Sequence, residues 1–163
     1  AAEGALERFG VDFIARRMAG HWDLQAIEVN LRQGGTTHPY MALCALTTGR
    51  LDPASGRFLT PTGEALHYQA TDNLCDERLR GLLPVDLIDI VAEAGLHYDP
   101  ARLRGSVFHL LGCLSEFGKL GMTSIGRDDQ EADAVFQATV ERLLAGASQR
   151  RSASLDHLML AGR

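Results

Sequence analysis

The chain has 163 residues, of which 45% are hydrophobic and 23% charged. This is enough apolar material to form one domain or two small lobes. The same composition excludes a disordered or fibrous protein. Arg, Asp or Gly breaks each apolar stretch well before about 18 residues, which excludes a membrane-spanning helix. The net charge of −5 gives no electrostatic case for nucleic acid or an anionic membrane as a partner.

Two β-prone runs come first in the chain. Residues 9–14 hold a single carboxylate, and residues 22–32 alternate apolar and polar side chains, with the apolar phase ambiguous at Ala26 or Ile27. A short polar connection containing Gly20 joins the runs, which predicts an antiparallel hairpin. We expect Ile27, Val29 and Leu31 to project into the core.

The next segments are a loop, a helix and a connector. Gln33 to Pro39 form the loop, and Thr37 as N-cap with Pro39 in the first turn predicts a helix to about Thr48. Residues 49–63 contain Pro53 and Pro61 and form the best candidate boundary between two lobes.

The sequence pattern of the second half of the chain predicts an α+β layer, in which the elements follow in the order strand, helix, strand, strand, helix. We expect strands at 65–71, 106–111 and 119–125, a helix from 84 to 95, a turn at 115–119, and a helix from Asp128 and Asp129 through Leu143. The predicted domains are 1–63, 64–148 and a basic tail over 149–163.

The three cysteines lie far apart, among apolar neighbours, at Cys44, Cys75 and Cys113. Neither a Cys-x-x-Cys pair nor a His-rich cluster accompanies them, which argues against zinc and favours buried, reduced thiols of a cytoplasmic protein. The chain begins Ala1-Ala2-Glu3 without a targeting segment, and we interpret it as a piece of a longer protein.

The second strand carries the residues that point to chemistry. Side chains on a strand alternate faces, so Glu28, Asn30 and Arg32 are expected on one side. Carboxylate and amide oxygens suit Mg²⁺, and a nearby guanidinium could bind phosphate. Asp12 would supply a third oxygen if its strand pairs with the second. Taken singly, each residue has a plain structural alternative: a surface Glu28–Arg32 ion pair, or an Asp12 turn cap.

The loop after the strand favours an anion. Gly34 and Gly35 let the backbone approach a ligand closely, and the N-terminus of the following helix points N–H groups at the same place. The loop continues with Thr36 and Thr37 and then His38, which either contacts substrate or bonds the helix start.

Together these motifs resemble a known superfamily. Asp12, the stretch Glu28-Val29-Asn30-Leu31-Arg32 and the loop Gly34 to Pro39 resemble the C-terminal metal-binding hairpin of ATP-grasp enzymes. The longer stretch, and the segment Phe108 to Gly121, look like carboxylate–amine ligases related to the pheganomycin-type peptide ligase. The expected fold is therefore the C-terminal portion of an ATP-grasp fold over 1–63, followed by a small α+β domain over 64–148.

The resemblance implies an ATP-dependent ligase that joins a small-molecule carboxylate to an amine or peptide through an acyl phosphate. It implies Mg²⁺ on Asp12, Glu28 and Asn30, and catalytic roles for Arg32, Gly34 and Gly35. It also implies ATP contacts from Asn30, Arg32, Thr36 and Thr37, and substrate contact from His38. Such phosphoryl transfer needs positioning and charge neutralisation rather than a side-chain nucleophile.

The lysines and adenine pocket of an ATP-grasp enzyme would lie upstream, and this chain holds one lysine, Lys119. We therefore expect its partner to be the missing N-terminal part of the same ligase, and the chain alone to be inactive. Two alternatives stay open: a non-catalytic binding or oligomerisation module with the ligase fold, and self-association into a homo-oligomer.

Overall fold

A computed structural model describes residues 9–161 and has the expected mixed α+β class. Residue contacts divide it into two compact units, one ending at Ala42 and the other beginning at Leu43. Each unit is described by itself below. The lobe boundary that the sequence suggests, near residue 63, stays a prediction.

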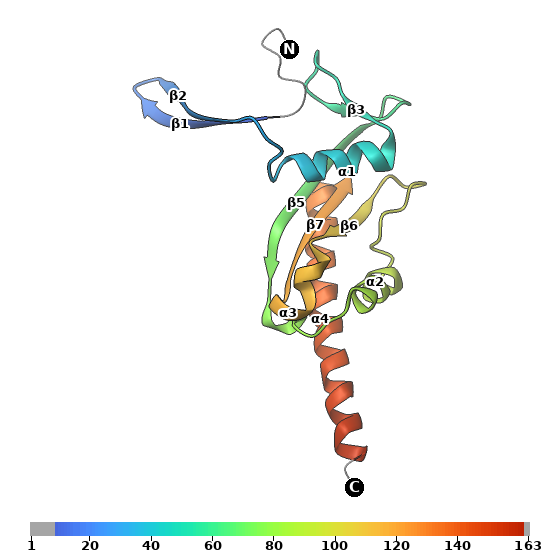
Figure 1. The fold of residues 1–163 in the computed structure, drawn as a ribbon. Coiled ribbons are helices and arrows are strands. Elements are labelled where there is room, and N and C mark those ends of the chain that lie inside the picture. Colours follow the sequence, from blue (N-terminus) through green and yellow to red (C-terminus); the bar gives the residue numbers. More distant parts are fainter. Residues whose placement is uncertain (1–8, 162–163) are drawn as a thin grey trace. The chain divides into compact units, whose positions relative to one another are not determined.

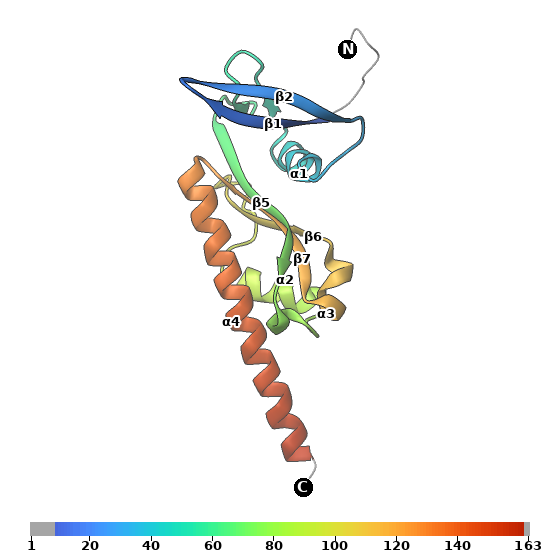
Figure 2. The ribbon, with the colours of Figure 1, turned by 90° about the vertical axis from the view of Figure 1, so that its left-hand side faces the viewer.

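The first unit contains the expected antiparallel hairpin, formed by β1 (Gly10–Met18) and β2 (His21–Asn30) (Figure 2). The turn is tighter than the sequence suggests, because only Ala19 and Gly20 separate the strands, and Gly20 has a φ of 87° that favours glycine. The pairing slips once: Asp12 lies opposite Glu28 but Phe13 lies opposite Ala26, so Ile27 is an extra residue in β2. This is a β-bulge.

The bulge settles the ambiguous phase of the second strand. Because paired residues share a face, the polar side chains before and after Ile27 come to one face, and the apolar ones to the other. The sequence pattern predicted that these apolar side chains are buried in a core, but they are exposed. Ile27 is 60% and Val29 57% exposed, and Leu31, beyond the end of β2, is 75% exposed.

The second unit is built on a five-stranded antiparallel sheet in the order β3-β4-β5-β7-β6 (Figure 1). In chain order the strands are β3 (Arg50–Leu51), β4 (Phe58–Leu59), β5 (Ala65–Cys75), β6 (Gly105–His109) and β7 (Lys119–Gly126). The α-helices of the chain are α1 (Thr37–Thr47), α2 (Pro84–Glu93), α3 (Leu114–Phe117) and α4 (Asp129–Ala161), and short 3-10 turns occupy Glu77–Leu79 and Leu111–Cys113.

The three strands expected in the second half, the positions of α1 and α2, and the start of α4 agree with the sequence patterns. The patterns missed the two-residue strands β3 and β4, and predicted a turn where α3 lies. A helix of four residues shows too little periodicity to be recognised from sequence. Its glycine stop, Gly118, has a φ of 61° and ends α3 in the left-handed conformation.

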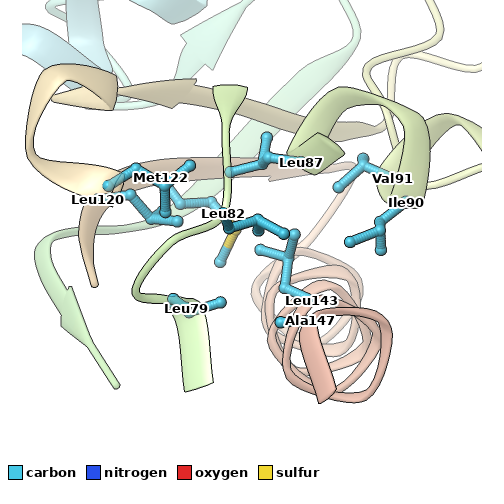
Figure 3. Close-up of a cluster of buried hydrophobic side chains, with 10 residues drawn as sticks. Leu79, Leu82, Leu87, Ile90, Val91, Leu120, Met122, Leu143 and Ala147 are labelled. Carbon is cyan, nitrogen blue, oxygen red and sulfur yellow. The ribbon is translucent and has the colours of Figure 1, made fainter. Parts of the chain in front are cut away.

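The core of the second unit lies between the sheet, α2 and α4 (Figure 3). Strand β7 contributes Leu120 and Met122, while helix α2 contributes Leu87 and Val91, all at most 1% exposed. The cluster also contains Leu79, Leu82, Ile90, Leu114, Leu143 and Ala147. Burial of this apolar surface supplies the main stabilisation of the unit.

A small polar network is buried between the sheet and α4. The Ser106 hydroxyl lies 2.7 Å from that of Ser124 and 2.9 Å from that of Thr139, and Thr139 donates to the Val135 carbonyl. Each member thus has a partner, which offsets the cost of burying hydroxyls. The network pins α4 to both β6 and β7.

Two sequence expectations need correction here. Residues after 148 were expected as a tail, but α4 continues through Ala161, and the Arg150 guanidinium pairs with the Asp86 carboxylate of α2; residues 162–163 lie outside the described part. The thiols are free but not all buried, since Cys75 is exposed and Cys44 and Cys113 are half-buried. None of the helices within residues 9–161 combines the length and apolar character needed to cross a bilayer.

Candidate functional site

The hairpin brings together the three oxygen-bearing side chains that the sequence singled out. Asp12 of β1 lies directly opposite Glu28 of β2, so the two carboxylates share one face of the hairpin. Asn30, two residues further along β2, is on the same face, and its Nδ2 donates to Asp12 Oδ2 over 3.3 Å. Asp12 and Glu28 are exposed and Asn30 is half-buried.

This donor set fits a hard cation. Two facing carboxylates, with an amide oxygen left over when Asn30 uses its nitrogen, are the ligand types that Mg²⁺ accepts while keeping several waters. No group of three or more His, Cys, Asp or Glu side chains that could hold a metal occurs in the described residues. The described residues therefore show no closed metal cage, and a role of this cluster in holding Mg²⁺ together with phosphate oxygens stays a prediction.

A second polar cluster lies farther along the same face. Arg16 Nη2 contacts Asp23 Oδ2 at 2.6 Å, and Gln25 donates to the same carboxylate oxygen over 3.3 Å. Because Asp23 is already neutralised by Arg16, it is a poor candidate for a metal ligand. It is, however, a useful matched comparison for Glu28, since both are carboxylates on one face of β2.

Arg32 is not brought to the carboxylates. It follows the end of β2, is exposed, and its Nη1 donates to the neighbouring Gln33 carbonyl over 3.4 Å. The alternative Glu28–Arg32 surface ion pair does not form either, within the residues that the structure describes. Alternation along the strand predicted a shared face, but it applies only as far as the strand extends, and β2 stops at Asn30.

The glycine loop is closed on itself. The Gly34 amide donates to Thr37 Oγ1 over 3.1 Å, and the Thr37 amide donates back to the Gly34 carbonyl over 2.9 Å. Gly34 therefore spends its N–H on the buried Thr37, whereas Gly35 and Thr36 are exposed at the bend. His38 is exposed in the first turn of α1.

A further charged cluster, in the second unit, was not singled out from sequence. Glu131 of α4 accepts hydrogen bonds from Arg127 Nε at 3.0 Å and Nη2 at 2.9 Å, and Arg104 Nη1 lies 3.6 Å from it. These bonds, and then the Arg127 backbone amide, hold the pKa of Glu131 at about 2. The available signal in the sequence was the pair Arg102 and Arg104, which stand one on each side of Leu103.

A segment of the second unit is similar to a known protein family. Residues 86–139 match the PGM1 C-terminal domain. The matched segment starts in α2, includes β6, α3 and β7, and ends in α4 at the buried Thr139. It holds Leu87, Leu120 and Met122 of the core, so the match describes the structural centre of the second unit.

A curated relative extends the similarity beyond the PGM1 C-terminal domain. The chain is 32% identical over 138 residues to an L-propargylglycine–L-glutamate ligase of Streptantibioticus cattleyicolor. The aligned region is 85% of this chain but 28% of that ligase, so the chain spans little more than a quarter of the relative's length. No solved structure matches the chain. The resemblance to the C-terminal part of carboxylate–amine ligases is confirmed.

Proposed function

We propose that this chain is the C-terminal part of an ATP-dependent carboxylate–amine ligase and that its hairpin holds Mg²⁺ for ATP. The observation that carries the proposal is the direct pairing of Asp12 with Glu28, with Asn30 bonded to Asp12. The similarity to a ligase whose name gives L-propargylglycine and L-glutamate as substrates supports the reaction class. We also propose a cytoplasmic location, where ATP is available.

In the proposed reaction, a substrate carboxylate oxygen attacks the γ-phosphorus of ATP, and the bond to the bridging oxygen breaks to release ADP. An amine then attacks the acyl carbon, phosphate leaves, and the amine loses a proton as the amide forms. Mg²⁺ bound to ATP would neutralise charge on the transferring phosphoryl group. Asp12 and Glu28 would fix the ion, and the Asn30 amide would orient Asp12.

The residues around the bend would assist in a more limited way than the sequence suggested. Arg32 is exposed at the end of β2, and a modest movement of its side chain would allow it to bind a phosphate. Gly35 and Thr36 offer exposed backbone at the bend, while the Gly34 amide is already used by Thr37. We therefore assign phosphate contact to Arg32, Gly35 and Thr36, and a loop-closing role to Gly34 and Thr37. We keep His38, exposed beside the bend, as a substrate contact.

The partner that we propose is the upstream part of the same ligase, which would contribute adenine and substrate contacts. The exposed apolar face of the hairpin supports this, because Trp22 (61% exposed), Leu24 (62%) and Phe13 (56%) lie on it. Contiguous apolar surface of this kind usually marks an interface. In that arrangement the apolar face packs against the rest of the ligase, and the carboxylate face meets ATP.

The test uses the complete product of the gene that encodes this chain. The protein is incubated with ATP, Mg²⁺ and hydroxylamine, and the carboxylate substrates tried are L-propargylglycine and a panel of amino acids. Formation of hydroxamate with release of ADP supports the acyl phosphate, and release of AMP would contradict it. Glu28→Gln and Asn30→Ala should each lower kcat/KM by about 100-fold or more, whereas the matched Asp23→Asn variant should keep most activity.

The alternative, a non-catalytic module, predicts the opposite result for these variants. If Glu28→Gln and Asn30→Ala ligate as fast as the parent, the metal assignment is wrong. If the parent forms no hydroxamate with any carboxylate in the panel, but binds its upstream segment, the binding-module interpretation is favoured.

A further inference from the structure

A polar cleft of about 770 Å³ lies in the second unit, where the β4–β5 connection faces the loop before β6. Its volume is in the range of small-molecule sites. Its lining includes three arginines, Arg102, Arg104 and Arg127, which we call the arginine wall, and also Glu64 with Thr60 and Thr62. The lining therefore carries charges of both signs.

The arginine wall has hydrogen-bonding capacity to spare. Each guanidinium has five N–H donors. Arg127 uses Nε and Nη2 on Glu131, which leaves Nη1 unused, and the 3.6 Å contact from Arg104 to Glu131 is too long to be a hydrogen bond. Glu131 is thus the carboxylate that contacts both guanidiniums within the described residues, and Arg127 also interacts electrostatically with Asp128 and Glu64. The unused donors of Arg104 and Arg127 would bind an oxyanion in the cleft.

The loop that carries Arg102 and Arg104 is held in a fixed shape. The Asp99 amide donates to the Arg104 carbonyl over 2.8 Å, and the Ala101 amide donates to Asp99 Oδ1 over 2.8 Å. Leu103, between the two arginines, has a φ of 53°, a conformation that costs about 1 kcal/mol or more for a non-glycine residue. Arg102 also lies 3.5 Å from Asp99, so its charge is partly balanced.

Glu64 gives the cleft a hydrogen-bond acceptor. Glu64 Oε2 accepts from Thr62 Oγ1 over 3.0 Å, and Thr62 Oγ1 lies 2.9 Å from Thr60 Oγ1. No ion pair from Glu64 occurs in the described part of the chain, although Arg127 is near enough to feel its charge. The carboxylate therefore retains lone pairs for a cationic donor.

We propose that this cleft binds a zwitterion of amino-acid or short-peptide size, with the ligand carboxylate on Arg104 and Arg127 and its ammonium group on Glu64. A phosphate would satisfy the arginines but would face Glu64 with like charge. A simple cation would satisfy Glu64 but face three guanidiniums. The inference depends on the charges of the cleft alone and does not require ligase chemistry.

The test is a titration of the full chain, without nucleotide, followed by amide NMR shifts and calorimetry. The probe is glycylglycine, compared with N-acetylglycylglycine, which lacks the ammonium group, and with inorganic phosphate. We expect saturable binding of glycylglycine with shifts confined to residues 60–64, 100–104 and 127. The acetylated probe should bind about tenfold more weakly, and Glu64→Gln should remove that difference.

The arginine wall is tested with Arg104→Gln, which should weaken glycylglycine binding about tenfold or more. Arg142→Gln, an exposed arginine of α4 outside the cleft, is the control and should bind like the parent. If Arg104→Gln unfolds, Arg127→Gln replaces it, because Arg127 is the other arginine proposed to bind the carboxylate and its side chain is 64% exposed. Absence of saturable binding at about 10 mM, equal binding of both peptides, or tighter binding of phosphate would each overturn the proposal.

Discussion

Asp12 and Glu28 face each other directly across the hairpin, with their carboxylates on the same side. Like charges in directly opposite positions of an antiparallel pair destabilise it. The Mg²⁺ that we propose would offset this repulsion. On that proposal, the stability of the hairpin depends on divalent ions.

The first prediction follows from this repulsion. Without divalent ions, Asp12→Asn should stabilise the hairpin by about 0.2–1 kcal/mol, because one of the two facing charges is removed. With Mg²⁺ the order should reverse, since the parent gains binding energy that the variant lacks. Amide hydrogen exchange of β1 and β2, with and without Mg²⁺, measures both effects. Equal protection of parent and variant in Mg²⁺ would contradict the metal assignment.

The second prediction concerns the core between α2, α4 and the sheet. Leu87→Ala should lower the free energy of unfolding by about 2–5 kcal/mol, because the leucine is fully buried and its loss leaves a cavity. Val85→Ala on the same helix removes an exposed side chain (58%) and should change stability by less than about 0.5 kcal/mol. Urea unfolding measures both; similar losses from the two variants would mean that α2 packs differently.

The third prediction concerns a glycine where the chain has no room for a side chain. A Cβ on Gly105 would lie 2.2 Å from the His97 carbonyl oxygen, and the φ of Gly105 is 126°. Gly105→Ala should therefore destabilise the unit by well over about 1 kcal/mol. Gly112→Ala meets open space at an ordinary φ and serves as the control. Thermal unfolding of the two variants tests this, and an unchanged midpoint for Gly105→Ala would refute it.

The fourth prediction is a loss of stability in acid. Hydrogen bonds from Arg127 hold the pKa of Glu131 at about 2, and those from Arg78 hold the pKa of Asp76 at about 2. Both values lie below those of the unfolded chain, so the unfolded state binds protons first as the pH falls. The contribution is complete above about pH 5 and is lost progressively towards about pH 2.

Urea unfolding at several pH values between these limits measures the acid effect. Glu131→Gln should cost about 1 kcal/mol at neutral pH, since Arg127 is well exposed and its pairing is screened by water. The same variant should show a shallower fall in acid than the parent. An identical fall would show that Glu131 is not the group responsible.

The sequence predicted the hairpin, the class and most helices because their signals are local. Alternation gave β2, and Pro84 with the Leu87 and Val91 spacing gave α2. The burial of Ile27 and Val29 was wrong, because alternation shows which side chains share a face but not whether anything covers it. The expected place of Arg32 on the face of Glu28 and Asn30 stays a prediction, since the strand ends before that residue and alternation no longer applies there.

The same difference between local and long-range signals applies to the candidate site. The sequence offered Asp12 as a third oxygen only if its strand paired with the second. The direct opposition of Asp12 and Glu28 also depends on the bulge at Ile27, which the alternation did not predict. The Arg104–Glu131–Arg127 cluster joins residues from a loop, the end of β7 and α4. Contacts between segments so far apart in the chain have no local pattern, and they appear only when the fold is known.

The bulge in β2 decides which face of the hairpin carries Glu28 and Asn30. Were Ile27 to take a regular place in the ladder, strict alternation would put Glu28 and Asn30 on the face of Trp22 and Leu24 instead of the face of Asp23. One unpaired residue thus separates a surface that can attract a cation from one that would leave a carboxylate among hydrocarbon side chains.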